Sequence, residues 1–252
     1  MKKIISVSFF IMLWGLSSGQ GYFSEIEVTV GYSIIQGDFG EKGNFSSNLG
    51  NTGFLLGGKA YIDCYSCSRI KFPLILNIGY SGLGFDNAYK DTELTPDLIK
   101  TKALSGYVYQ GLIGAGVEFH IGDLSTYSQM NSDFLRIFDP YIGGFIGLTG
   151  YSVHLESELG DFKAYPDILP SAFKNSIYDK PGIVFTSGFE GGFRYWLKSN
   201  LTITVNSRWI YYASDKVDGL MPDPDRVSNT HNDWLFAPSI GVVFFLDNSG
   251  FY

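Results

Sequence analysis

Polar and apolar residues alternate with a period of two along eight segments of the chain. In the first segment, Ile26, Val28 and Val30 share one face, whereas Glu25 and Glu27 share the other. Successive side chains of a β-strand point to opposite faces, so the alternation predicts strands with one apolar and one polar face. The predicted strands cover residues 25–34, 53–62, 70–81, 107–121, 141–155, 183–197, 201–211 and 234–246. Several exceed the usual length of about 5–6 residues, and their even number suits a closed antiparallel sheet.

The two faces differ in a way that is unusual for a soluble protein. The apolar face is almost wholly aliphatic and aromatic, while the polar face is rich in glycine and small residues and carries few charges. Lipid suits the first face, and a narrow interior filled by side chains suits the second. The polar faces carry four acidic and four basic residues: Glu25, Glu27, Glu118, Glu190, Lys59, Lys71, Arg194 and Arg208. Because unpaired buried charges are costly, we expect these eight residues to form a lumen charge network.

The connections between the predicted strands alternate between long and short. The odd connections cover about 37–52, 86–103, 156–182 and 214–233, whereas two even connections cover only 63–69 and 198–200. The remaining even connection, about 122–138, is longer. Short periplasmic turns and longer outer loops are typical of outer-membrane barrels, so the pattern also indicates orientation. The sequence therefore predicts an all-β fold, an eight-stranded antiparallel up-and-down outer-membrane β-barrel with a filled lumen.

The first nineteen residues have the features of an export signal. Two lysines precede an apolar run at 4–16, and Ser17 and Gly19 are the small residues before a cut at Gln20. We therefore predict a signal peptide at 1–19 and a barrel domain at 20–252, located in the outer membrane. No later apolar run approaches the ~18 residues of a membrane helix. With a mean hydropathy of +0.06, the chain is not expected to be a polytopic helical membrane protein.

Aromatic residues and the last strand agree with a membrane barrel. Tyrosines and tryptophans near the predicted strand ends suit interfacial girdles. They are Tyr32, Tyr80, Tyr107, Tyr141, Trp196, Trp209 and Trp234. Ser239, Gly241, Phe244 and Leu246 resemble the signal that barrel assembly machinery reads in a final strand, so this machinery and outer-membrane lipid are expected partners. In the fifth segment both faces are apolar, which leaves its register open.

Few residues suggest a bound cofactor. The formal charge of -7 without a basic run gives no electrostatic footprint for nucleic acid. Cys64 and Cys67 lie in the first short connection, where an oxidising compartment favours a disulfide over free thiols. A thioredoxin-like site would need a βαβ unit, and a zinc site would need two further ligands. We predict no catalytic residue, no cofactor and no metal.

The three histidines and the last acidic loop leave alternatives open. His120 and His154 fall near strand ends on the expected lumen side, and His231 lies in the last long loop. Satisfied lumen histidines are the simpler interpretation, and a catalytic histidine is the alternative. The loop residues with oxygen ligands are Asp215, Asp218, Asp223, Asp225, Asn229, Asn232 and Asp233. They could hold calcium, but their spacing matches no defined calcium loop, so a solvated acidic loop is the favoured interpretation.

Several stretches resemble a known family. They are Gly37–Phe45 (GDFGEKGNF), 51–54 (NTGF), 214–220 (SDKVDGL) and 232–234 (NDW), together with the opening Glu25-Ile26 strand. These stretches are similar to small outer-membrane barrels of gliding, type IX-secreting bacteria, the PorG-like barrels. The resemblance implies a barrel in the cell envelope and an association with type IX secretion or gliding machinery, and it brings no catalytic residues.

We therefore expect a non-enzymatic structural or interaction protein that docks an envelope partner through its loops. Two alternatives remain: a small outer-membrane barrel enzyme acting on lipid or peptide, and a soluble secreted ligand-binding β-barrel. A pore is disfavoured because eight strands leave an interior wide enough only for side chains.

Overall fold

The computed structural model describes residues 23–39, 48–62, 69–85, 92–121, 138–171, 173–174, 176–198, 200–220 and 232–246. Several sequence predictions lie outside these residues. They concern the signal peptide at 1–19, the disulfide between Cys64 and Cys67, His231, and the loop residues Asp223, Asp225 and Asn229.

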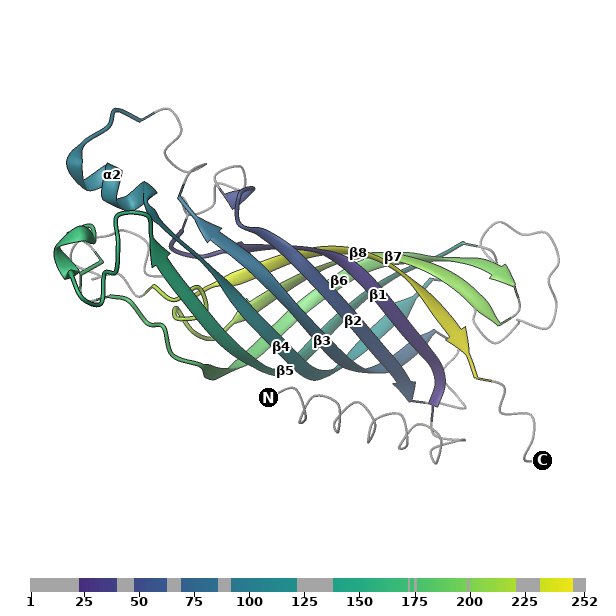
Figure 1. Cartoon of the computed structure of the whole chain (residues 1–252). Coiled ribbons are helices and arrows are strands. Elements are labelled where there is room, and N and C mark those ends of the chain that lie inside the picture. Colours follow the sequence, from purple (N-terminus) through teal and green to yellow (C-terminus); the bar gives the residue numbers. More distant parts are fainter. Residues whose placement is uncertain are drawn as a thin grey trace.

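Eight long strands form the fold. They are β1 (Phe23–Gln36), β2 (Thr52–Ile62), β3 (Ile70–Gly84), β4 (Leu104–His120), β5 (Phe138–Ser157), β6 (Gly182–Lys198), β7 (Leu201–Tyr212) and β8 (Trp234–Phe245). Each strand pairs antiparallel with the next in sequence, and β1 also pairs with β8, which closes the barrel (Figure 1). Val30 of β1, for example, lies opposite Leu56 on one side and Ile240 on the other. The predicted closed, eight-stranded antiparallel fold is confirmed.

The described residues of the β1–β2, β3–β4, β5–β6 and β7–β8 connections lie together at one end of the barrel, which we call the mouth. Helix α2 (Pro96–Lys102) lies in the β3–β4 connection, and a 3₁₀ turn, η3 (Pro166–Ile168), lies in the β5–β6 connection (Figure 1). Thr95 caps α2, since its side-chain oxygen accepts a hydrogen bond from the N–H of Leu98 at 3.3 Å. Pro96 begins this helix, where its missing N–H costs nothing.

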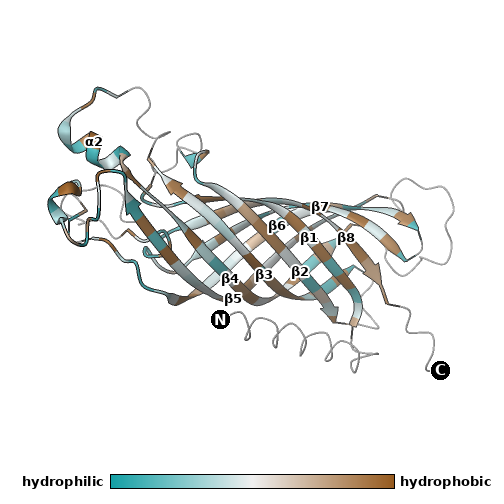
Figure 2. Ribbon diagram, in the orientation of Figure 1, coloured by the Kyte–Doolittle hydropathy of each residue, from teal (hydrophilic) through white to brown (hydrophobic). Residues whose placement is uncertain are grey.

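Large apolar side chains cover the outer wall of the barrel. Ile183 is 78% exposed and Tyr32 is 71% exposed. Figure 2 shows hydrophobic and hydrophilic residues alternating along the strands. Soluble monomers rarely expose apolar patches larger than a few hundred Å², so this wall is suited to lipid. None of the described helices has the length and hydropathy needed to cross a bilayer.

The register of β5, which the sequence left open, is decided by its neighbour β4. Glu118 points inward and lies opposite Gly143, while Phe119 points outward and lies opposite Ile142. Directly opposed residues share a face of the sheet, so the odd-numbered residues of β5 face the interior. The buried residues Tyr141, Phe145, Tyr151, Val153 and Leu155 are therefore interior, and Ile142, Ile146 and Leu148 face lipid.

The interior is divided into an apolar half near the mouth and a charged half near the opposite end. We call the apolar half the mouth core. It combines inward strand residues, among them Ile35, Leu83, Leu104, Val108, Val153, Val184 and Leu235, with loop residues Phe162, Leu169, Phe173, Val217 and Leu220. The sequence indicated only a polar filled lumen, because alternation within strands carries no information about loops that fold back over the barrel end.

Candidate functional site

Lys59 is the centre of the charged half. Its Nζ lies 2.7 Å from Glu118 Oε1, 2.5 Å from Glu190 Oε1 and 3.5 Å from Glu27 Oε1. Strands β1, β2, β4 and β6 supply these four side chains, all of them buried. A single ammonium group therefore links carboxylates from three other strands. Buried charges need such pairing to offset the cost of leaving water.

Two arginines extend the same network. Arg194 Nη1 donates to Glu25 Oε2 at 2.7 Å, and the guanidinium stacks on the ring of Tyr61 with 4.7 Å to the ring centroid. Arg208 Nε donates to Glu190 Oε2 at 2.8 Å, while its Nη1 donates to Asn77 at 2.7 Å. A guanidinium suits these sites because its five donors lie in a fixed fork.

The structure places all eight residues of the proposed lumen charge network in this half of the barrel. The last of them, Lys71, is in direct contact with Glu25. The sequence analysis did not include a further buried hydrogen bond, between His120 and Asp139. His120 Nδ1 lies 2.6 Å from Asp139 Oδ2, and its Nε2 lies 3.2 Å from Glu118 Oε2. Asp139 was missed because the sequence analysis assigned 122–138 to a connection and began the fifth strand at Tyr141.

The charge network closes the end of the barrel opposite the mouth. Tyr61 adds an uncharged donor to the network. Its hydroxyl donates to Glu27 Oε2 at 2.8 Å and lies 3.1 Å from Glu118 Oε1. Ion pairs, aromatic rings and the mouth core fill successive layers of the interior. An eight-stranded barrel is just wide enough for such a filling, which argues against an aqueous channel through the described part of the protein.

Four aspartates gather where β1 and β8 reach the mouth: Asp38, Asp215, Asp218 and Asp233. We call them the mouth carboxylates. Asp218 Oδ2 accepts from the backbone N–H of Asp38 at 2.5 Å, and its Oδ1 accepts from the N–H of Leu220 at 2.8 Å. Asp233 Oδ2 accepts from the N–H groups of Val217 at 2.8 Å and Asp218 at 3.1 Å. These bonds tie the β7–β8 connection to the end of β1.

Burial raises the pKa of each mouth carboxylate, and repulsion between carboxylates raises it further for Asp38, Asp218 and Asp233. Desolvation, followed by the charges of Asp218 and Asp215, raises the pKa of Asp38 to about 10. Desolvation raises the pKa of Asp218 to about 7 and that of Asp215 to about 6. The pKa of Asp233 is also well above its ordinary value, first through desolvation and then through the charge of Asp218. The cluster therefore resists carrying four negative charges.

Three sequence-based placements are corrected by the structure. His154 lies on the exposed outer face, packed against the ring of Tyr107 at 5.1 Å, and not in the lumen. Its even number on β5 puts it opposite Tyr107 and on the lipid-facing side. Tyr141 and Trp196 are buried and point inward, so they do not belong to an interfacial girdle. Both share a face with charged network residues on their own strands.

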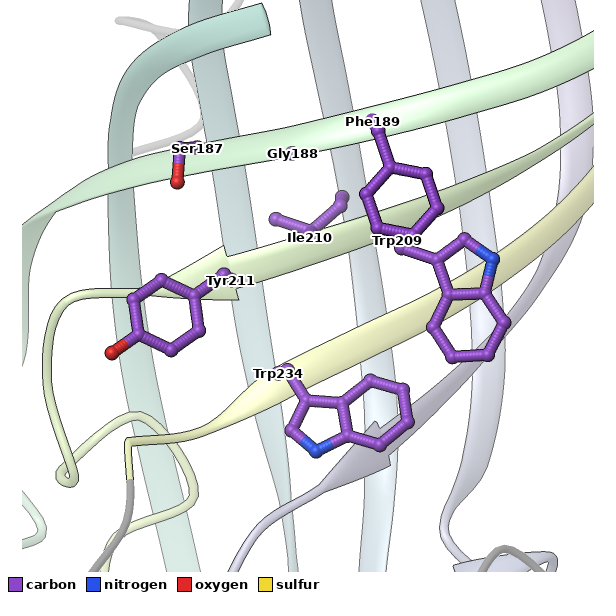
Figure 3. Close-up of a pocket in the computed structure, with 7 residues that line it drawn as sticks. All are labelled: Ser187, Gly188, Phe189, Trp209, Ile210, Tyr211 and Trp234. Atoms are coloured by element: carbon purple, nitrogen blue, oxygen red, sulfur yellow. The ribbon is translucent and has the colours of Figure 1, made fainter. Parts of the chain in front are cut away.

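The expected girdle is present near the mouth on β6, β7 and β8. The Trp209 ring stacks on Trp234 with centroids 5.2 Å apart and on Phe189 at 5.9 Å. Around these rings lies a shallow groove of about 540 Å³, which Ser187 and Tyr211 also line (Figure 3). Stacked indoles at this level are typical of the membrane–water interface.

In the positions that the structure gives them, no three or more His, Cys, Asp or Glu side chains of the described residues are grouped so that they could hold a metal ion. No family model and no curated protein matches the sequence.

Solved structures, in contrast, are similar in fold. Neisserial surface protein A has a TM-score of 0.50 and 13% identity, covering 88% of this chain and 96% of that one. A major outer membrane protein of Thermus thermophilus has a TM-score of 0.47 and 11% identity, covering 88% and 99%. The outer membrane enzyme PagL has a TM-score of 0.36 and 12% identity, covering 88% and 100%. Identities this low show the fold alone. With its closed sheet and apolar wall, the chain is an eight-stranded antiparallel β-barrel of the outer membrane.

Proposed function

We propose that this barrel is a non-enzymatic structural and interaction protein, which presents an ordered platform at its mouth to another protein of the cell envelope. The platform consists of residues 92–103 and 158–171. One observation carries the proposal. The platform packs on the mouth core through buried side chains, yet it exposes apolar side chains on its outer surface. Tyr165 is 69% exposed, and Leu94, Ile99 and Leu159 are exposed as well.

Polar contacts join the two halves of the platform. Lys100 Nζ donates to the backbone oxygen of Asp167 at 2.6 Å, and Ser171 Oγ donates to Asp97 Oδ2 at 2.7 Å. Below them, Phe162 and Leu169 are buried in the mouth core. Fully burying a side chain of this size stabilises by about 1.5–3 kcal/mol, which offsets the entropy of ordering the loop. A preorganised apolar surface loses less entropy when it binds a partner.

Site-specific photo-crosslinking tests this proposal. A photoreactive residue at Tyr165 or Leu94, introduced in cells, is expected to give one discrete adduct with an envelope protein. The same probe at Ile142, which is exposed on the outer wall, serves as the control and is expected to label lipid only. A double Tyr165→Ser, Leu94→Ser variant should lose the partner while keeping its heat-modifiable gel mobility. Lipid labelling alone from both platform positions would contradict the interaction role.

The identity of the adduct tests a finer proposal. The resemblance carried by 37–45 and 214–220 supports a partner in the type IX secretion or gliding machinery. An adduct with an unrelated envelope protein would keep the interaction role and reject the type IX assignment. We also propose that barrel assembly machinery inserts the protein into the outer membrane by reading its last strand.

One observation favours a second function, a hydrolase that acts on lipid or peptide at the outer wall. Ser152, His154 and Glu156 follow one another on the exposed face of β5, near the mouth. These are the residue types of a serine hydrolase, and lipid lies beside them. Purified protein is tested on ester-linked lipid and on peptides, with Ser152→Ala and His154→Ala as variants. Turnover lost in both folded variants supports this function, and wild-type turnover no faster than buffer rejects it.

A further inference from the structure

We infer that the mouth carboxylates form a binding site for a divalent hard cation of the calcium class, which fastens the β7–β8 connection to the end of β1. This inference goes beyond the interaction role and does not depend on it. The sequence analysis considered only the acidic residues of the last loop. The structure brings in Asp38 from the opposite side of the barrel's closing seam.

Several oxygens of the cluster are buried without a partner. Neither carboxylate oxygen of Asp38 has a hydrogen bond, although the residue is only 6% exposed. Asp233 is fully buried, and its Oδ1 is also unpartnered. Buried polar atoms are nearly always satisfied, so unpartnered carboxylate oxygens call for a proton, a water molecule or an ion.

No basic group among the described residues neutralises the cluster. The donors to Asp218 and Asp233 are neutral backbone N–H groups. Lys216, the nearest lysine in sequence, lies over the ring of Tyr178 at 5.0 Å from its centroid. The other titratable groups beside Asp233 are the tyrosines Tyr151 and Tyr212, which add no positive charge. Four carboxylates therefore lie in one region. Burial is the main cause of their raised pKa values, and repulsion adds to it for Asp38, Asp218 and Asp233.

A cation accounts for the geometry better than protons do. A single proton on Asp38 would remove one charge, but it would leave the unpartnered oxygens of Asp215 and Asp233 without a positively charged neighbour among the described residues. A calcium ion accepts 6–8 oxygen ligands in flexible geometry at about 2.3–2.6 Å. Both carboxylate oxygens of Asp38 and Oδ1 of Asp215 make no hydrogen bond, so these oxygens are available to such an ion.

The backbone around the cluster is shaped to let the carboxylates approach. A Cβ on Gly37 would collide with Asp218 Oδ2 and lie 2.6 Å from Asp233 Oδ1. Only glycine leaves this space to the two carboxylates, so Gly37 keeps the site open. The cation would join residues that directly follow β1 and directly precede β8, and would thus close the barrel seam at the mouth.

Calcium titration of the full-length protein, refolded in detergent micelles and treated with EDTA, tests this inference. At pH 7.5 we expect calcium chloride to raise the melting temperature by several degrees and to slow hydrogen exchange in 213–220. Magnesium should act more weakly, and sodium at matched ionic strength should have no effect. Asp38→Asn should weaken the apparent calcium affinity at least tenfold. In EDTA its melting temperature should stay close to that of the wild type, because a pKa of about 10 already leaves Asp38 uncharged at this pH.

A matched control keeps the test specific. Asp167→Asn removes an exposed carboxylate from the neighbouring connection and should leave the calcium response unchanged. A stabilisation that Asp38→Asn leaves intact, or one that sodium reproduces, would show charge screening and overturn the site. No calcium response, combined with stability that depends only on pH, would assign the cluster to protons and overturn it as well.

Discussion

Replacing Lys59 by methionine tests whether the charged half of the barrel depends on its central ammonium group. The substitution keeps the length of the side chain but removes the charge that contacts Glu118 at 2.7 Å and Glu190 at 2.5 Å. Glu118 and Glu190 then lose the cation that they share, and only the guanidinium groups of Arg194 and Arg208 remain beside them. Removing one partner of a buried ion pair typically costs about 3–5 kcal/mol.

The cost can be derived independently from proton uptake. The variant relieves the repulsion most simply if one glutamate binds a proton. Each pH unit above the ordinary glutamate pKa of about 4.3 costs about 1.36 kcal/mol, so uptake costs about 3.7 kcal/mol at pH 7 and about 1 kcal/mol at pH 5. The destabilisation should therefore decrease by roughly three quarters as the pH falls from 7 to 5.

Urea unfolding in lipid vesicles, followed by tryptophan fluorescence, measures this free energy of unfolding. Lys163→Met is the matched control, because it removes a lysine whose contact with Asp179 is solvent-exposed, and no measurable change is expected. A Lys59→Met variant that loses less than about 1 kcal/mol at pH 7, or whose loss does not vary with pH, would refute the reasoning.

Three further predictions concern the histidines, the closing seam and the mouth. His120→Ala should cost about 1–3 kcal/mol, because Asp139 and Glu118 each lose a buried hydrogen bond. His154→Ala on the outer wall should change stability by less than about 0.5 kcal/mol in the same urea assay. Gly241→Ala should cost about 1–3 kcal/mol and reduce the heat-modifiable band, because the new methyl group would collide with a backbone oxygen of β1. Gly84→Ala is the control and should change neither quantity, because no atom lies within 4 Å of the added Cβ. In EDTA, the β7–β8 connection should become more sensitive to protease as the pH rises from 5 to 8. The pKa of Asp215 is raised to about 6 and that of Asp218 to about 7, so both side chains lose their stabilising proton between pH 5 and 8. A cleavage rate that does not change with pH would contradict this prediction.

The sequence predicted the wall of the barrel well because a wall is a local property. Alternation places Glu118 and Arg194 on one face and Phe119 and Ile183 on the other, whatever the rest of the chain does. The same alternation, combined with the long and short connections, predicts an antiparallel closed sheet. The charged residues of the interior could be predicted from their positions in the two-residue period alone, without any knowledge of the distances between them.

Alternation is uninformative where both faces are apolar, as in β5. There the choice of face depends on pairing with β4, a contact between residues far apart in sequence. This choice moved Tyr141 inward and His154 outward. It also brought Asp139 to His120, 2.6 Å apart, although no local pattern joins them.

The amino-acid sequence by itself determined that the chain forms a barrel, how many strands it has, and which residues of most strands face lipid, because these follow from a two-residue period. Only the tertiary structure decided how the barrel is filled and closed. The mouth core and the mouth carboxylates are assembled from connections whose backbone has no period, and Asp38 meets Asp218 across the seam between the first and last strands. Such contacts form only when the whole sheet closes and brings residues that are far apart in sequence together, so no local sequence pattern predicts them.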